Sequence, residues 1–133
     1  MTRVTMRFTF LMSACLVSFS AAQASSSRLP PSFMKIEPRT RSLQVCNNMG
    51  SREIGREKEY SRLDRVVVDA MSNPTFDRNT ISGSGGAFRV KGQWHQFQFR
   101  CTLADDKLSA TSFTFQVGDI IPEAQWERYG LWR

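Results

Sequence analysis

The chain has 133 residues, of which 18 are Lys or Arg and 12 are Asp or Glu, so its formal net charge is +6 at pH 7. A chain of this length is expected to form one domain, large enough for a single hydrophobic core. The excess of basic residues favours anionic partners over cationic ones.

The first 24 residues have the pattern of a secretory signal peptide. Arg3 and Arg7 precede an apolar run over residues 8–19, and the small residues of Ala22-Gln23-Ala24 follow it. The run is too short to span a bilayer as a helix, so we expect cleavage after Ala24 and a periplasmic or secreted protein without a transmembrane span. The signal holds two of the 18 basic residues and none of the acidic ones, which lowers the net charge of the mature chain from +6 to +4.

A second export route involves Cys15. Met12-Ser13-Ala14-Cys15 loosely resembles the sequence that precedes a lipidated bacterial cysteine, and acylation there would tether the protein to a membrane. The apolar run continues beyond Cys15, which favours cleavage after Ala24 over lipidation.

In chain order, residues 25–36 are predicted to be an extended lead-in and residues 37–133 a single α+β domain. The lead-in is rich in Ser and contains Pro30-Pro31, as expected of an accessible segment. A helix is expected over residues 38–57, because Pro38 suits a first turn and apolar residues recur at helical spacing. This apolar face consists of Leu43, Cys46, Gly50 and Ile54.

The remainder is predicted to be an antiparallel sheet of about four strands. A β-branched strand is expected over residues 66–71, and another over 79–90, where glycines indicate a bulge or a close backbone contact. Residues 97–103 and 111–117 alternate between apolar and polar with a period of two, which predicts a hairpin with an aromatic face. A short helix over residues 122–129 is expected to close the chain.

Cys46 and Cys101 are the cysteines left after signal cleavage, and we expect a disulfide between them in an oxidising compartment. Cys46 lies on the apolar face of the predicted helix and Cys101 on the apolar face of a predicted strand, so the bond would fix the helix across the sheet. Two thiolates and the lone His95 fall short of a usual tetrahedral metal site, so no metal or other cofactor is expected.

The basic residues are the main candidates for binding. One group runs from the end of the predicted helix to the start of the first strand and consists of Arg52, Arg56, Lys58, Arg62 and Arg65, of which the four arginines are the candidate binding residues. It could bind an anionic surface, but the intervening acidic residues make a solvated face of mixed charge the alternative. A second group, Arg89, Trp94 and Arg100, belongs to the strands. Trp94 would be either an exposed recognition residue or a residue covered by the C-terminal helix.

Signals for catalysis are weaker. His95 could act as a general base with a carboxylate, yet it is the only histidine and spacing alone supplies no nucleophile for it. The stretch Gly83-Ser84-Gly85-Gly86 leads into a strand and lacks the Lys of a phosphate-binding loop, so a strand irregularity is the favoured interpretation. The carboxylates Asp64, Asp69, Asp77, Asp105 and Asp106 are expected to be solvated or paired.

Several segments resemble a known family of small exported alphaproteobacterial proteins, domain of unknown function 930 (DUF930). The resemblance rests on five segments: Phe33-Met34-Lys35-Ile36-Glu37-Pro38-Arg39-Thr40-Arg41, Gln44-Val45-Cys46, Asp64-Arg65-Val66-Val67-Val68-Asp69-Ala70, Gly85-Gly86-Ala87-Phe88-Arg89 and Ile121-Pro122-Glu123-Ala124-Gln125-Trp126-Glu127-Arg128-Tyr129-Gly130-Leu131-Trp132. It implies an exported domain and provides no activity, ligand or catalytic residue.

Taken together, the sequence favours a non-enzymatic binding or envelope-associated module for an acidic ligand, surface or protein. Export argues against nucleic acid as the partner. One alternative is an inhibitor or accessory subunit of an envelope enzyme, with Trp94 and the C-terminal aromatic residues as anchors. The other is a small periplasmic enzyme that uses His95.

Overall fold

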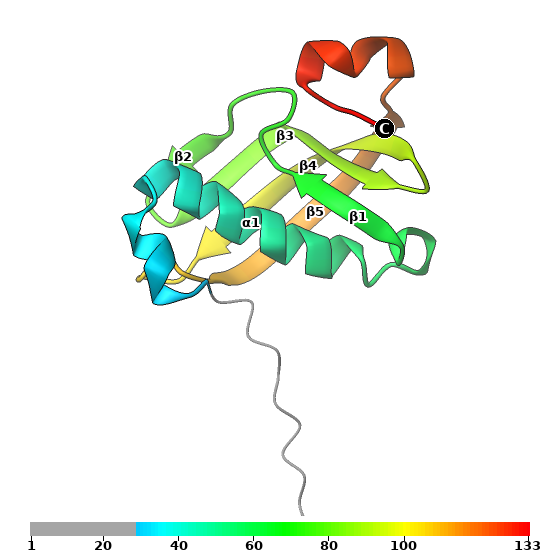
Figure 1. Cartoon of the computed structure of the whole chain (residues 1–133). Coiled ribbons are helices and arrows are strands. Elements are labelled where there is room, and N and C mark those ends of the chain that lie inside the picture. The colour runs from blue at the N-terminus through cyan, green and yellow to red at the C-terminus, as the bar shows by residue number, and fades with distance from the viewer. Residues whose placement is uncertain (1–28) are drawn as a thin grey trace, which may run out of the picture.

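The computed structural model describes residues 29–133, so the predicted signal peptide and Cys15 lie outside the described residues. One long α-helix packs against a five-stranded antiparallel sheet, as Figure 1 shows. The predicted α+β class is confirmed, with one strand more than expected. The elements are α1 (Pro38–Ile54), β1 (Leu63–Val67), β2 (Thr75–Asp77), β3 (Thr80–Val90), β4 (Gln93–Leu103) and β5 (Ala110–Ile120).

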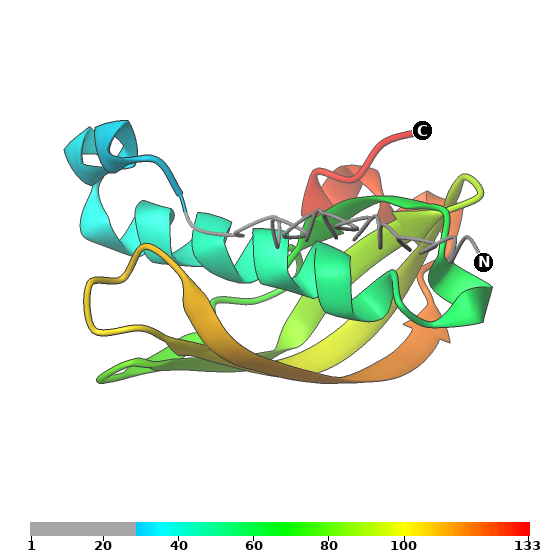
Figure 2. The same ribbon diagram turned by 90° about the horizontal axis from the view of Figure 1, so that it is seen from below.

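The sheet has the order β1-β3-β4-β5, with β2 paired to the other half of β3. It curves beneath α1, and the helix lies in the resulting trough (Figure 2). β1 begins and ends earlier than the predicted strand over 66–71. The chain leaves the ladder after Val67 because the backbone N–H of Val68 donates to Asn47 Oδ1 on α1, at 2.8 Å.

The helix begins where the sequence predicts and ends three residues earlier. Glu37 caps it, because its carboxylate accepts hydrogen bonds from the N–H groups of Arg39 and Thr40, both at 2.8 Å. These bonds lower the pKa of Glu37, since they stabilise its charged form. Gly55 follows the last helical residue.

Part of the predicted extended lead-in is not extended. Pro31–Lys35 form a 3-10 helix, and Leu29 is buried, with its N–H donating to the carbonyl of Leu108 at 2.8 Å. The two prolines fix φ near the helical range, and Leu29 gains an apolar contact with the core. Folded structure therefore extends closer to the predicted cleavage site than the composition indicates.

The predicted hairpin is confirmed as β4 and β5, in which Phe99 pairs with Phe115 and Cys101 with Phe113. The irregularity predicted for the Gly-rich stretch is also confirmed, because the register of β3 against β4 shifts between Gly83 and Gly86. A Cβ at Gly86 would lie 2.6 Å from the ring of Phe97. The glycine is thus required by the close approach of an aromatic side chain.

The disulfide between Cys46 and Cys101 is confirmed. It joins α1 to β4, with the two Cα atoms 6.0 Å apart and both side chains fully buried. The same core cluster contains apolar residues of both α1 and β4, including Val45, Ile54, Phe97 and Phe99. The apolar face of the helix therefore packs against the apolar face of the strand, as their periodicities predict.

The C-terminal segment forms two 3-10 turns, Glu123–Gln125 and Glu127–Tyr129, in place of the predicted helix. It builds a second apolar cluster on the side of the sheet opposite α1, since Trp94 alternates with the helix-facing residues of β4. Trp94 is fully buried there, beneath Trp126 and Leu131. The hypothesis of an exposed Trp94 is wrong, and the alternative of a Trp94 covered by the C-terminal segment is correct.

Candidate functional site

Two arginines and two tryptophans converge where β1, β3 and the C-terminal residues meet. β1 and β3 pair so that Arg65 lies opposite Arg89. Arg89 makes a two-pronged ion pair with Asp64, with Nε to Oδ1 at 3.0 Å and Nη2 to Oδ2 at 2.8 Å. Only 12% of the Arg89 side chain is exposed, so the guanidinium is committed to this contact. Its hydrogen bonds lower the pKa of Asp64.

The carbonyl of Trp132 fixes the end of the chain against this ion pair. It accepts a hydrogen bond from Trp94 Nε1 at 2.8 Å and another from Arg89 Nη1 at 3.2 Å. Gly130 makes the necessary turn, with a φ of 63° that a residue with a side chain adopts at a cost. The Trp132 backbone is thereby held by two donors from the sheet.

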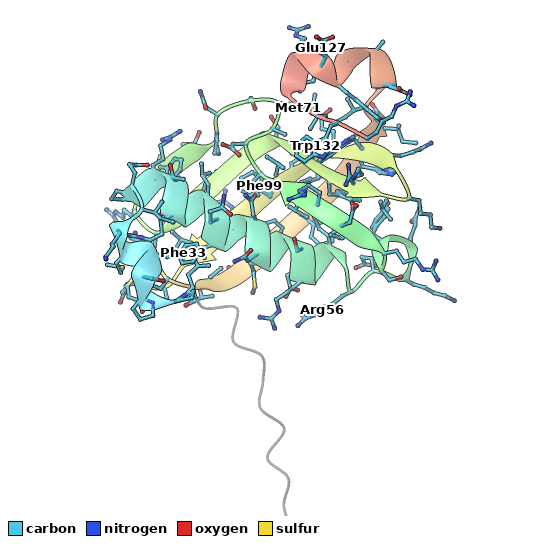
Figure 3. All side chains as sticks on the ribbon, viewed as in Figure 1. Phe33, Arg56, Met71, Phe99, Glu127 and Trp132 are labelled. Carbon is cyan, nitrogen blue, oxygen red and sulfur yellow. A yellow bond between two sulfur atoms is a disulfide. The ribbon has the colours of Figure 1, made fainter. Side chains whose placement is uncertain are left out.

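The indole of Trp132 stays accessible although its backbone is held. Figure 3 labels Trp132, which lies near β1. The residue is 46% exposed, and its ring meets that of Trp94 edge to face with the centroids 5.7 Å apart. The Arg65 guanidinium lies 5.3 Å from the centre of the Trp132 ring, within cation–π range. Arg65 and Trp132 therefore form an exposed aromatic and cationic pair.

A polar groove lies between α1 and β1, and Trp132 is one of its lining residues. Its volume is about 340 Å³. We call it the helix–strand groove, and its polar and aromatic lining residues are Gln44, Asn47, Asn48, Ser51, Asp64, Arg65, Asp69 and Trp132. The four α1 residues follow one another at helical spacing along a single face. Amide and hydroxyl groups thus face carboxylates and an arginine across the groove.

The formal charges at this site are balanced. Asp64 is neutralised by Arg89, while Asp69 and Arg65 contribute one charge of each sign. Within residues 29–133, Arg65 makes no ion pair with a carboxylate. The guanidinium of Arg65 is consequently the cation at this site that a ligand can engage without breaking an existing ion pair.

Comparison of the sequence with models of known protein families identifies the family. The DUF930 model, described as Domain of Unknown Function, matches residues 33–131. The chain belongs to the DUF930 family. The match includes every residue of the helix–strand groove except Trp132, and it agrees with the resemblance seen in the sequence. The chain matches no curated protein and no solved structure.

The DUF930 fold brings three of the seven predicted binding residues together and separates the other four. Arg65, Arg89 and Trp94 meet at Trp132, with Trp94 acting as a buried support. Arg56 pairs with Glu53 at 2.9 Å and projects away from Trp132 (Figure 3). The others are exposed elsewhere: Arg52 on the last turn of α1, Arg62 before β1, and Arg100 on β4.

Arg100 lies in a separate shallow depression on the outer side of the sheet. This depression has a volume of about 440 Å³ and is lined by residues of β3, β4 and β5, including Ser82, Gln98 and Thr114. It is larger than the helix–strand groove but more open, and it contains no tryptophan. Arg100 therefore provides a matched basic residue away from the groove.

Sequence reasoning missed the polar side of α1 and the position of Trp132 beside Arg65, although it named the C-terminal aromatic residues as anchors in one alternative. The signal for the first was present, because Gln44, Asn47, Asn48 and Ser51 recur at intervals of three and four residues. No signal in the sequence indicated that Trp132 would lie beside Arg65. Its position depends on the turn at Gly130 and on donors from strands about forty residues away.

His95 lies in another pocket, with a volume of about 320 Å³, next to Glu59 and Tyr60. Its ring stacks on Phe88 with the centroids 5.1 Å apart. Burial lowers the pKa of His95, because it disfavours the charged imidazolium. Among the described residues, no hydrogen bond joins His95 to a carboxylate.

Two further properties bear on the functional class. Residues 29–133 contain no group of three His, Cys, Asp or Glu side chains placed to hold a metal ion. In the same part of the chain, no helix is both long and apolar enough to cross a membrane.

Proposed function

We propose that this DUF930 protein is an exported, non-enzymatic binding module of the periplasm or cell envelope, which recognises a ligand carrying a negative charge through Arg65 and Trp132. Export is supported by the charged, apolar and small-residue pattern of residues 1–24. A covalent link between α1 and β4 suits a small domain in an oxidising compartment.

The single observation that carries the proposal is the pairing of Arg65 with an exposed indole whose backbone is fixed. Arg89 is neutralised by Asp64, whereas Arg65 makes no ion pair within residues 29–133. An aromatic surface beside an available guanidinium is a typical recognition anchor, because it combines contact area with directional hydrogen bonds. The two donors to the Trp132 carbonyl reduce the ordering cost of binding.

Retention on envelope preparations of the producing cell tests this proposal. We expect Arg65→Glu to abolish most of the binding at low salt, and we expect wild-type binding to weaken strongly at about 0.5 M salt, where exposed charges are screened. Arg100→Glu is the matched control, since it makes the same charge change on β4, outside the groove. Equal retention of the two variants would refute the assignment of binding to Arg65.

A second candidate is an inhibitor or accessory subunit that binds an envelope enzyme through apolar contacts. The exposed hydrophobic residues favour it: Trp132 is 46% exposed, and Ile120, at the end of β5, is 53% exposed. Such a complex would have a fixed stoichiometry and survive high salt. Retention that is unaffected at about 0.5 M salt but lost in Ile120→Ser would therefore favour this candidate.

An enzyme based on His95 receives less support. The ring stacks on Phe88 and is partly buried, and no hydrogen bond to a carboxylate orients it among the described residues. A general base is usually oriented by such a partner. We therefore place the functional site at the helix–strand groove and not at His95.

A further inference from the structure

We propose that the helix–strand groove binds a carbohydrate that carries a carboxylate, such as a uronic acid unit of an oligosaccharide. The inference rests on the proposed function and specifies its ligand class. It is drawn from three properties of the groove: the hydrogen-bonding character of its walls, the exposed indole among its lining residues, and the presence of one available cation.

The walls suit a ligand with many hydroxyl groups. Gln44 and Asn48 present side-chain amides, which both donate and accept, and Ser51 adds a hydroxyl. Asp64 and Asp69 only accept, so the ligand must supply donors to them. Sugar hydroxyls donate and accept at each position of the ring and therefore match this mixture.

The indole of Trp132 suits the other surface of a sugar. A pyranose ring exposes C–H groups on its faces, and these pack against an aromatic ring with loss of apolar surface to water. Trp132 is 46% exposed, and its carbonyl is held by Trp94 and Arg89. A sugar can therefore stack without first ordering the end of the chain.

The charges limit the acidity of the ligand. Arg65 can pair with one carboxylate in a two-pronged geometry. Asp69 lines the same groove and, unlike Asp64, is not neutralised by Arg89, so its carboxylate repels a densely anionic ligand, such as a phosphate or a sheet of acidic lipid headgroups. One negative charge among several hydroxyl groups is the combination that fits.

The size of the groove is consistent with a short ligand segment. Its volume of about 340 Å³ lies near the lower end of the range for small-molecule sites, which is about 300–1,000 Å³. We therefore expect recognition of one or two sugar units, either free or within a longer chain. Comparison of short with polymeric ligands distinguishes these two sources.

Calorimetric titration of the mature protein tests the inference. The probes are di- and trisaccharides of glucuronate, galacturonate and mannuronate, polymers of the same acidic sugars, and the di- and trisaccharides with their carboxyl groups reduced to alcohols. Inorganic phosphate and vesicles containing anionic phospholipid complete the set. At least one acidic saccharide should bind, roughly tenfold more tightly than its reduced counterpart, because the reduced sugar loses the charged hydrogen bonds to Arg65.

Variants assign the contacts. Arg65→Gln should bind an acidic saccharide and its reduced form equally. Trp132→Ala should weaken the binding of both by roughly tenfold through loss of the aromatic contact. Asn48→Ala, an exposed change on α1, should weaken both and provides a second test in case Trp132→Ala disturbs the C-terminal segment. Arg100→Gln is the control and should bind as the wild type does.

Two outcomes overturn the inference. One is the absence of binding by any acidic saccharide up to about 10 mM, a very weak affinity for a specific site. The other is binding of phosphate or anionic vesicles in preference to saccharides. In either case, envelope retention that still depends on Arg65 would leave the proposed function intact. If the acidic saccharides do not bind and envelope retention does not depend on Arg65 either, both proposals are refuted.

Discussion

Removal of the Cys46–Cys101 disulfide should lower the stability of this domain by a large fraction. The two cysteines are 55 residues apart in the sequence. In the chain-entropy model, a closed loop of this length stabilises the folded state by about 4 kcal/mol relative to a chain without the bond. A small domain has a total stability of about 5–15 kcal/mol, so the reduced protein should retain only part of it.

Thermal unfolding followed by circular dichroism, with and without a reductant, measures the effect on the mature chain. For a domain of about 100 residues, each 1 kcal/mol shifts the melting temperature by about 4–8 °C, so we expect a decrease of about 15–30 °C on reduction. The doubly substituted protein, Cys46→Ala with Cys101→Ala, should melt near the reduced wild type or below it. Its two Ala side chains also leave a cavity in the core.

The double variant is also the control for the reductant, because its melting temperature should not change when the reductant is added. Oxidised and reduced wild type that melt within about 3 °C of each other would refute the reasoning. Such a result would mean that the unfolded chain already holds α1 and β4 together, or that the folded core gains nothing from the link.

Two further predictions concern the sheet and the ion pair. Gly86→Ala should destabilise the fold by about 1–3 kcal/mol in urea titration, because its Cβ would lie 2.6 Å from the Phe97 ring. Gly118→Ala is the control and should destabilise clearly less, since the nearest neighbour of its Cβ would lie at 3.4 Å. Equal losses of stability would contradict this packing. Asp64→Asn should destabilise the protein most at neutral pH. Arg89 lowers the pKa of Asp64, so the ion pair contributes above the ordinary carboxyl pKa and its contribution is lost as the pH falls through the lowered value. The difference between the two proteins should therefore begin to shrink at about pH 4, the ordinary pKa of an aspartate, and disappear only below the lowered pKa of Asp64. A difference that is constant with pH would exclude the ion pair as its cause.

Much of the fold could be predicted from local patterns. The apolar face of residues 38–54 and the alternation of 97–103 and 111–117 each have a clear period, so the helix, the hairpin and the helix–strand disulfide were all predicted correctly. Shorter elements could not be predicted in this way. β2 has three residues, and the C-terminal segment forms single 3-10 turns, which are too short to establish a period.

The candidate site could be predicted only in part, because the sequence gives the type of each residue, whereas its position in space depends on the tertiary structure. Arg65, Arg89 and Trp94 were selected by type. Their convergence depends on the register in which β1 pairs with β3, and a strand sequence does not specify its partner's register by itself.

The sequence alone therefore determined an α+β domain, its disulfide and a short list of basic and aromatic residues. These properties depend on the periodicity of apolar residues and on charge, which residues close together in the sequence are enough to show. The tertiary structure alone decided which arginine is neutralised and which remains available. That decision required Asp64 to meet Arg89 across the β1–β3 pair, and Trp132 to return to the sheet after the turn at Gly130. These contacts join segments about 25 to 43 residues apart, and only folding brings them within hydrogen-bonding distance.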